Sequence, residues 1–128
     1  MQDACLNIPE RVEQETLIIH ATLLLRERGY DERLLFAIPN GGTRSNKIEA
    51  ANMKRGGVRA GIPDLMLAIP SQDFHGLFIE MKKRHGGTVS KAQKEVIPLL
   101  AAQGYRCEIC RGFGEALGVL KDYLDIKV

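Results

Sequence analysis

This chain of 128 residues lacks several features that would assign a protein to a class at once. No apolar run approaches the roughly 20 residues that a membrane-spanning helix needs. The N-terminus has neither the basic start nor the apolar core of a signal peptide. Only three cysteines are present, as is typical of a reducing compartment. These absences predict a cytoplasmic protein that does not engage a membrane.

Cysteine and histidine chemistry also has little support. Cys107 and Cys110 form a Cys-x-x-Cys, but they lie in a predicted strand, where positions three apart face opposite sides. No second cysteine pair exists to complete a zinc site. The three histidines, His20, His75 and His85, match no metal-binding or histidine-based nuclease spacing. An α/β enzyme that works through cysteine or histidine is therefore the weakest functional hypothesis.

The net charge is only +2, so neither sign is in large excess, but the charges are unevenly distributed. Residues 44–59 hold five basic side chains against one acidic one, and residues 82–94 hold five with no acid. A polyanion held between two basic segments is one interpretation. The alternative is a solvated charged surface, which most charge runs are.

Apolar periodicity and turn residues predict four helices and four strands in one domain that spans residues 1–128. Helices are expected at 10–28, 45–55, 88–103 and 114–124, and strands at 34–38, 65–69, 77–81 and 105–110. This order is typical of an α/β fold in which helices flank a small mixed sheet. The last two strands should be parallel, since a helix connects them. Ser90 is expected to cap the third helix, and Pro98 to kink it.

The most informative residues lie at the ends of two predicted strands. Asp64 follows Pro63 at the start of one strand, and Glu80 and Lys82 close the next. Side chains alternate faces along a strand, so Glu80 and Lys82 point the same way. In an antiparallel hairpin with its turn centred on Gln72, Asp64 would lie opposite Glu80. Two carboxylates beside a lysine suit a hard divalent cation and phosphodiester hydrolysis.

These residues belong to a set of motifs that resembles the VRR-NUC domain family of the PD-(D/E)xK nuclease superfamily. The resemblance runs from about Glu10 to Leu124. Its marks, in order, are Pro39-Asn40-Gly41-Gly42, Gly57-Val58-Arg59-Ala60-Gly61-Ile62-Pro63-Asp64-Leu65, His75-Gly76-Leu77-Phe78-Ile79-Glu80-Met81-Lys82, Ser90-x-x-Gln93 and Gly104-Tyr105. It implies a restriction-endonuclease-like α/β core, DNA cleavage that depends on Mg²⁺ or Mn²⁺, and frequent homodimers. The stand-alone form implied is of the bacterial or phage type, at work in a bacterial or phage-infected host cell.

Carried over residue by residue, the resemblance implies that Asp64 and Glu80 bind the metal, with a main-chain carbonyl at Met81 as a further candidate ligand. Lys82 is expected to orient or activate the attacking water, and Gln93 to lie near the active centre. Five further polar residues are weaker candidates for DNA contact: Asn40, Arg44, Arg59, Lys83 and Lys91.

The family also uses a glutamate on the first helix, and the sequence offers Glu10, Glu13 and Glu15. Glu13 shares a helical face with Leu17 and is expected to point inward. Glu15 aligns with Arg11 on a polar outer stripe, and Glu10 is on the side of Glu13 but further out. Helical spacing therefore ranks Glu13 first and Glu10 next.

Two hypotheses remain beside the cysteine or histidine enzyme. The first is a metal-dependent DNA endonuclease that selects for structure, with branched DNA such as a four-way (Holliday) junction as the expected substrate, and acts as a homodimer. Shape selection is expected because no sequence-reading motif is appended to the domain. The second is a catalytically inactive nuclease fold that binds DNA or a protein. The intact Asp64, Glu80 and Lys82 favour the first.

Overall fold

The structure of the protein, a computed structural model, describes residues 7–39 and 46–125. All the predicted helices and strands are present there, with boundaries shifted by a few residues. In chain order they are α1 (Glu10–Glu27), β1 (Leu35–Ala37), α2 (Lys47–Arg55), β2 (Leu65–Leu67), β3 (Leu77–Lys82), α3 (Lys91–Ala102), β4 (Arg106–Arg111) and α4 (Phe113–Tyr123). A short 3₁₀ turn, Glu32–Leu34, precedes β1.

The four strands form one mixed sheet in the order β1-β2-β3-β4. The first two pairs are antiparallel, while β3 and β4 are parallel. The helix α3 joins the parallel pair, as the strand–helix–strand pattern predicts. The predicted α/β fold with a small mixed sheet is therefore confirmed.

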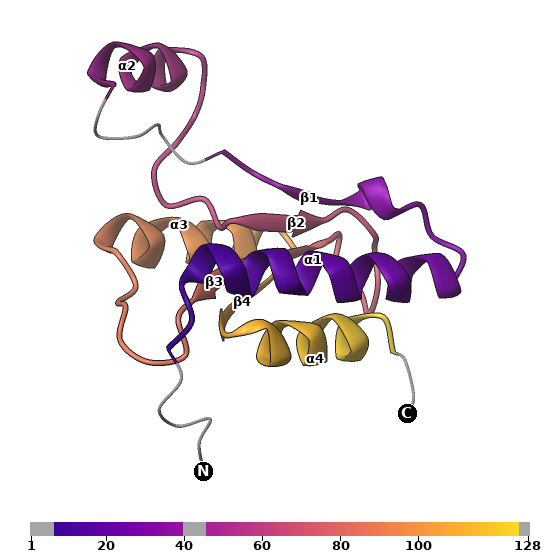
Figure 1. Ribbon diagram of the computed structural model, residues 1–128. Helices are drawn as coiled ribbons and strands as arrows, with labels where there is room; N and C mark the ends of the chain where they lie inside the picture. The colour runs from indigo at the N-terminus through magenta and orange to yellow at the C-terminus, as the bar shows by residue number, and fades with distance from the viewer. Residues whose placement is uncertain (1–6, 40–45, 126–128) are drawn as a thin grey trace.

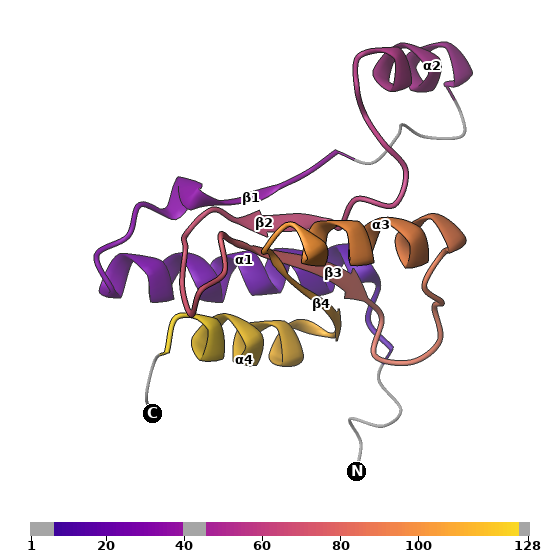
Figure 2. The same ribbon diagram turned by 180° about the vertical axis from the view of Figure 1, so that it is seen from behind.

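Helices cover both faces of the sheet. In Figure 1 α1 lies in front of the strands, and in Figure 2, seen from behind, α3 is nearer to the viewer and α1 is behind. The helices α1 and α4 pack against each other and against β3, whereas α3 packs against β4. Two helices therefore share one face of the sheet, and a single helix covers the other.

The apolar core lies between the sheet and the α1–α4 pair. Alternate residues of the strands point into it, including Leu65, Ile79 and Met81, and they meet Leu17 of α1 and Leu120 of α4. Each of these side chains is almost completely shielded from solvent. The opposite face of β3 carries Phe78, Glu80 and Lys82, because side chains alternate along a strand.

The β2–β3 hairpin turns where the sequence predicts. Leu65 pairs with Ile79 and Leu67 with Leu77, so the hairpin is centred on Gln72. Gln72 and the next residue have positive φ angles of 53° and 69°, as a tight turn requires. The Gln72 side chain donates a hydrogen bond to the carbonyl of Asp122, at 2.6 Å, which attaches the turn to the end of α4.

Three smaller predictions can be compared with the structure. The helix α3 runs through Pro98 without interruption, and the Lys94 carbonyl that loses a helical partner belongs to an exposed residue. Cys107 and Cys110 do lie on opposite faces of β4, since they pair with Phe78 and Met81 respectively. No helix in the described part of the chain is long and apolar enough to cross a membrane.

Candidate active site

The site is built where β2 begins and β3 ends. Extending the observed register by one step beyond Leu65 and Ile79 places Asp64 opposite Glu80, on the same face of the sheet. The amide of Met81 donates a hydrogen bond to Asp64 Oδ2 at 2.9 Å. This contact orients the Asp64 carboxylate toward the end of β3. The predicted pairing of the two carboxylates is therefore present.

Lys82 joins the same cluster. Its Nζ lies 3.3 Å from Glu80 Oε2, and both side chains are buried. The alternation of side chains along β3 makes this contact, because residues two apart lie on one face of a strand. The ammonium group is thus held beside the paired carboxylates, where it can compensate part of their charge.

Gln93 reaches the cluster from α3, and the start of that helix determines how its amide is turned. Ser90 caps α3 by accepting a hydrogen bond from the Gln93 amide at 3.1 Å, and the Ser90 amide donates in return to Gln93 Oε1 at 3.0 Å. This reciprocal pair is a capping box. Because Oε1 is occupied, Nε2 is the polar end of the side chain left to act on Glu80, whose pKa Gln93 lowers.

Glu80 is electrostatically unusual. Its side chain is 3% exposed, and Oε1 is buried with no hydrogen-bond partner among the described residues. Burial raises the pKa of Glu80, and repulsion from Asp64 raises it further. The hydrogen bond from Gln93 and the positive charge of Lys82 oppose this rise without cancelling it. A buried, unpartnered carboxylate oxygen costs free energy unless a cation or a proton completes it.

The donor set fits a magnesium or manganese ion. Asp64 and Glu80 supply carboxylate oxygens, which hard divalent cations prefer. Residues 7–39 and 46–125 contain no cluster of three or more His, Cys, Asp or Glu side chains that could hold a metal. Mg²⁺ commonly takes only one or two carboxylates and completes its shell with water and substrate phosphate. The unpartnered Oε1 of Glu80 is where such an ion would be accepted. The Met81 carbonyl remains a predicted further ligand.

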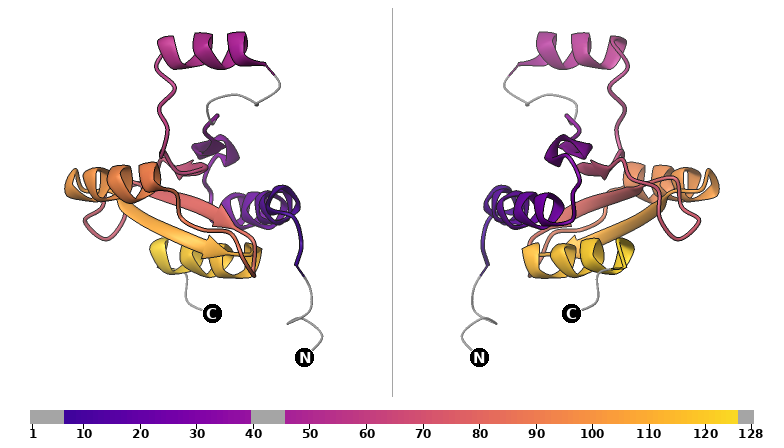
Figure 3. Two further views of the ribbon diagram at one scale, coloured as in Figure 1. Left: turned by 90° about the vertical axis from the view of Figure 1, so that its left-hand side faces the viewer. Right: turned by 90° about the vertical axis from the view of Figure 1, so that its right-hand side faces the viewer.

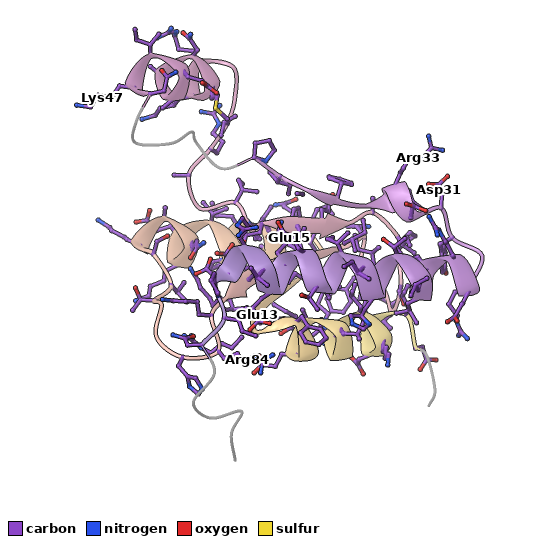
Figure 4. The ribbon with its side chains drawn as sticks, viewed as in Figure 1. Glu13, Glu15, Asp31, Arg33, Lys47 and Arg84 are labelled. Carbon is purple, nitrogen blue, oxygen red and sulfur yellow. The ribbon has the colours of Figure 1, made fainter. Side chains whose placement is uncertain are left out.

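Glu13 is as deeply buried as Glu80, at 1% exposure, but its carboxylate has other partners. Glu13 Oε2 accepts a hydrogen bond from Arg84 Nε at 2.8 Å, and Oε1 accepts one from the Phe113 amide at 3.0 Å. Figure 4 shows Glu13 and Arg84 together below α1, near the start of α4. The inward direction that helical spacing predicts is present, and the contacts are structural ones. A catalytic role for Glu13 remains a prediction.

The two other glutamates of α1 are placed differently. Glu15 is exposed and forms a surface ion pair with Arg11 at 2.9 Å, on the outer stripe expected for it. Glu10 Oε2 lies 3.9 Å from the point where a Cβ on Gly87 would be, and Lys82 Cδ lies 4.0 Å from the same point. Glu10 and the stem of Lys82 therefore flank Gly87. Glu10 thus shares a neighbour, Gly87, with the lysine of the site.

Arg111 is a supporting residue that the sequence analysis does not single out. Its guanidinium donates to the main-chain carbonyls of Lys83 at 3.2 Å, Gly86 at 2.5 Å and Gly87 at 3.2 Å. It therefore holds the segment that follows Lys82. The parallel pairing of β3 with β4 aligns Lys82 with Arg111. That pairing is predictable from the sequence, so it is the signal that could have identified Arg111.

The weaker candidates for DNA contact divide into two groups. Arg59 and Lys91 are exposed, and Lys83 is partly exposed. Arg59 lies between α2 and β2, Lys83 directly after β3, and Lys91 at the start of α3. Asn40 and Arg44 lie outside the described residues. The basic side chains of the first group come from three segments near the carboxylates in the chain, and their role in DNA binding remains a prediction.

Cysteine chemistry gains no support from the two cysteines that the structure describes, Cys107 and Cys110. Burial raises the pKa of Cys107 to about 11 and that of Cys110 to about 12. Both groups are therefore neutral thiols at physiological pH, and the thiolate is the form that attacks substrates or binds metals. His20 stacks on Phe113 and His75 contacts the edge of the Tyr105 ring. These two histidines pack against aromatic rings and do not converge with the carboxylates of the site.

Comparisons with known proteins agree with this geometry. A model of the VRR-NUC domain matches residues 9–114. A solved structure described as a VRR_NUC domain protein is 30% identical to this chain, with a TM-score of 0.78, over 93% of this chain and 90% of that one. No similar sequence was found among curated proteins. The matched span contains Asp64, Glu80 and Lys82, together with Gln93 of the capping box. The chain thus belongs to the VRR-NUC domain family, which is a family of nucleases.

Proposed function

We propose that this protein is a metal-dependent DNA endonuclease that hydrolyses phosphodiester bonds and selects branched DNA. One observation supports this most directly. Asp64 and Glu80 are paired beside Lys82, and the Oε1 atom of Glu80 is buried with no partner among the described residues. A site of this charge and burial favours the binding of a cation. A carboxylate pair kept only for stability would be expected to have its oxygens satisfied, as those of Glu13 are.

The side chains have distinct tasks in this proposal. Asp64 and Glu80 hold Mg²⁺ or Mn²⁺, which supplies Lewis-acid polarisation of the scissile phosphate when bound. Lys82 orients the attacking water and offsets the negative charge that develops on the phosphate. Gln93 fixes the Glu80 carboxylate through its amide. Water adds to phosphorus and the bond to the 3′ oxygen breaks, which leaves a 3′ hydroxyl and a 5′ phosphate.

Branched DNA and a homodimer are the finer parts of the proposal. Contacts to phosphates position DNA without reading its sequence, so in this proposal the shape of the DNA determines which substrate is cut. A dimer with twofold symmetry would present two active sites to matching strands of a four-way junction. The basic residues Arg59, Lys83 and Lys91 would contact phosphates. Their contribution would appear as a steep fall of affinity with salt, about one unit of log–log slope for each phosphate neutralised.

The test is a cleavage panel of linear duplex, flap, splayed-arm and four-way substrates of matched sequence. Each is incubated with Mg²⁺, with Mn²⁺ and with EDTA, and the oligomeric state is measured by sedimentation at the assay concentration. We expect cleavage only with a divalent metal, and faster cleavage of branched substrates by a dimer. Linear duplex cut as readily as a four-way junction, or a strictly monomeric active enzyme, would contradict the finer proposal.

The competing function is a nuclease fold that binds DNA or a protein without cutting. It predicts binding in the same panel but no product with either metal at any enzyme concentration. Distinguishing cleavage from binding alone also needs a control variant that keeps the fold and leaves the charges near the site unchanged. Glu15→Gln serves as this control, because Glu15 is exposed and paired only on the surface of α1.

A further inference from the structure

The helix α2 contributes nothing to the core of the protein. None of its residues is buried, and Ile48 is 77% exposed. Figures 1 and 3 show the helix held away from the sheet and the other helices. A helix of nine residues is marginal on its own in water. A helix that buries nothing within the described chain, yet is carried on an ordered support, suggests a contact with something outside it.

The support of α2 is built into the active-site end of the sheet. The helix is inserted between β1 and β2, and the Ile38 amide donates to the Asp64 carbonyl at 2.7 Å where the insertion joins the sheet. Gly61, at φ +90°, passes so close to α3 that an added Cβ would lie 2.5 Å from the Ala92 carbonyl oxygen. We call residues 46–62 the α2 arm. The arm is therefore seated on α3 and ends two residues before Asp64.

A cleft of about 480 Å³ lies between the α2 arm and the start of α3. Ala51 and Lys54 of α2 line one side, Ala60 of the returning segment lines another, and Ser90 and Gln93 of α3 line a third. Gln93 lines this cleft and also lowers the pKa of Glu80, so it lies between the cleft and the active site. A ligand in the cleft would thus lie next to the carboxylates that we assign to catalysis.

We infer that this cleft holds an unpaired DNA strand next to the scissile phosphate. The inference rests on the proposed nuclease function. The α2 arm and residues 91–95 of α3 contain six basic residues against two acidic ones, which favours a polyanion. The six are Lys47, Lys54, Arg55, Arg59, Lys91 and Lys94, and the two are Glu49 and Glu95.

The size and chemistry of the cleft favour one strand over a duplex. Its volume is in the range of pockets that hold small ligands, roughly 300–1,000 Å³, which suits one or two nucleotides. Small side chains such as Ala51 and Ala60 allow a sugar–phosphate backbone to approach closely. None of the described residues that line the cleft is aromatic, so the strand would be held through its backbone and charge and not by base stacking. The cleft would therefore select unpaired DNA without selecting sequence.

The experiment measures binding in EDTA, so that no DNA is cut. A splayed-arm DNA with a 2-aminopurine in its unpaired strand is compared with a fully paired duplex of the same sequence. Lys54→Gln removes the charge of the cleft, and Ala51→Leu fills it while keeping a good helix former. The matched controls are Arg28→Gln, on the exposed end of α1, and Ala102→Leu, on the exposed end of α3 away from the cleft.

We expect Lys54→Gln to reduce the salt slope for the splayed arm by about one unit. Ala51→Leu should weaken splayed-arm binding several-fold and abolish the 2-aminopurine signal without changing the slope. Duplex binding and both controls should remain as in the unmodified protein. An equal loss for duplex and splayed arm would overturn the inference in favour of a duplex under the arm.

Two other results would also overturn it. Unchanged DNA binding together with a changed sedimentation coefficient would show that α2 contacts a second copy of the chain. Unchanged binding and unchanged sedimentation would show that the cleft holds no strand. The nuclease proposal is tested separately by the cleavage panel on the unmodified protein. If the unmodified protein cleaves branched DNA but Ala51→Leu does not change DNA binding, the inference about the cleft is rejected while the nuclease proposal stands.

Discussion

Two buried glutamates, Glu13 and Glu80, show how the same side chain can be used in opposite ways. Both are at most 3% exposed. Glu13 has a partner for each oxygen, Arg84 for one and the Phe113 amide for the other. Glu80 leaves Oε1 without a partner among the described residues, and its pKa is raised by burial and by the nearby Asp64. The Glu13 carboxylate joins α1 to two other segments, whereas the environment of the Glu80 carboxylate favours binding of a cation.

The difference indicates which buried charge is structural and which is a candidate for function. A buried charge with all its partners stabilises a fold only modestly. Removing one partner leaves the other buried and unpaired, which lowers the free energy of unfolding substantially. An unsatisfied buried carboxylate lowers stability, and it persists where a ligand completes it. Loss of Glu13 should therefore weaken the fold, while loss of Glu80 should weaken catalysis. Four predictions test this contrast, from the largest effect to the smallest.

Replacing either metal-site carboxylate should have the largest effect. Asp64→Ala and Glu80→Ala are each expected to lower the cleavage rate by about 10³-fold or more, because a single carboxylate cannot hold the metal in place. The fold should survive, since removing one of two crowded carboxylates relieves repulsion. Single-turnover cleavage with Mg²⁺ measures the rate and circular dichroism the fold. Cleavage by Asp64→Ala at the unmodified rate would show that the site is assigned wrongly.

Lys82→Ala should lower the cleavage rate by about 10²-fold, because a positioned proton-transfer or charge-stabilising group contributes on this scale. The metal concentration at half-maximal rate should change less than the rate, since lysine is not a ligand. Lys82→Arg should restore only part of the rate, because a guanidinium differs in shape and keeps its proton. A metal titration of the three proteins makes the comparison. Full activity in Lys82→Ala would remove this residue from the mechanism.

Glu13→Ala should lower the free energy of unfolding by about 2–3 kcal/mol, because Arg84 and the Phe113 amide lose their buried partner. Urea denaturation measures this change. Glu15→Ala is the control and should cost only about 0.3–0.5 kcal/mol, as expected for an exposed pair within one helix.

The same variants test the choice of the first-helix acid. Cleavage per folded molecule is compared for Glu10→Ala, Glu13→Ala and Glu15→Ala under conditions where each is folded. Helical spacing predicts the greatest loss at Glu13, whereas the position of Glu10 near Gly87, which the Lys82 stem also approaches, favours Glu10. A loss only at Glu15 would contradict both.

Glu80→Gln should have the smallest effect, and its sign is opposite to that of Glu13→Ala. Without divalent metal, this change removes a buried carboxylate charge and its repulsion with Asp64. That gain should outweigh the loss of the Lys82 ion pair and raise the free energy of unfolding by up to about 1 kcal/mol. Between the ordinary pKa of glutamic acid and the raised pKa of Glu80, the folded protein keeps a proton on Glu80 that the unfolded chain has released. The stability of the unmodified protein should therefore fall as pH rises from the ordinary value for glutamic acid to the raised value.

Thermal unfolding between pH 4 and pH 8 in EDTA tests the last prediction. Glu80→Gln should flatten the profile, and Mg²⁺ should stabilise the unmodified protein but not the variant. A Glu80→Gln protein that is less stable than the unmodified one at pH 8 would show that Glu80 is structural, as Glu13 is.

Much of the fold follows from local pattern. The hairpin is centred on Gln72 as predicted, because alternation selects the face that buries Leu65, Leu67 and Ile79 and the polar turn around Gln72 fixes the register. The contact between Glu80 and Lys82 follows from the same period. Ser90 caps α3 because a serine followed three residues later by glutamine can satisfy two exposed amides at once.

Other features depend on contacts between distant segments. Glu13 is paired with Arg84 and Phe113, which are 71 and 100 residues away, so helical spacing could predict its direction but not its partners. The position of the α2 arm likewise depends on the approach of Gly61 to Ala92. Local periodicity has no information about these encounters, because they arise only when elements pack.

The sequence by itself determined the elements, the mixed sheet, and the placing of Asp64, Glu80 and Lys82 on one face, because alternation along a strand and the turn of a hairpin are local properties. Only the tertiary structure decided which buried carboxylate is satisfied. It also decided that Gln93 is shared by the active site and the cleft. Burial and hydrogen bonding are properties of the packed whole, and they distinguish Glu80 from Glu13 where residue type cannot.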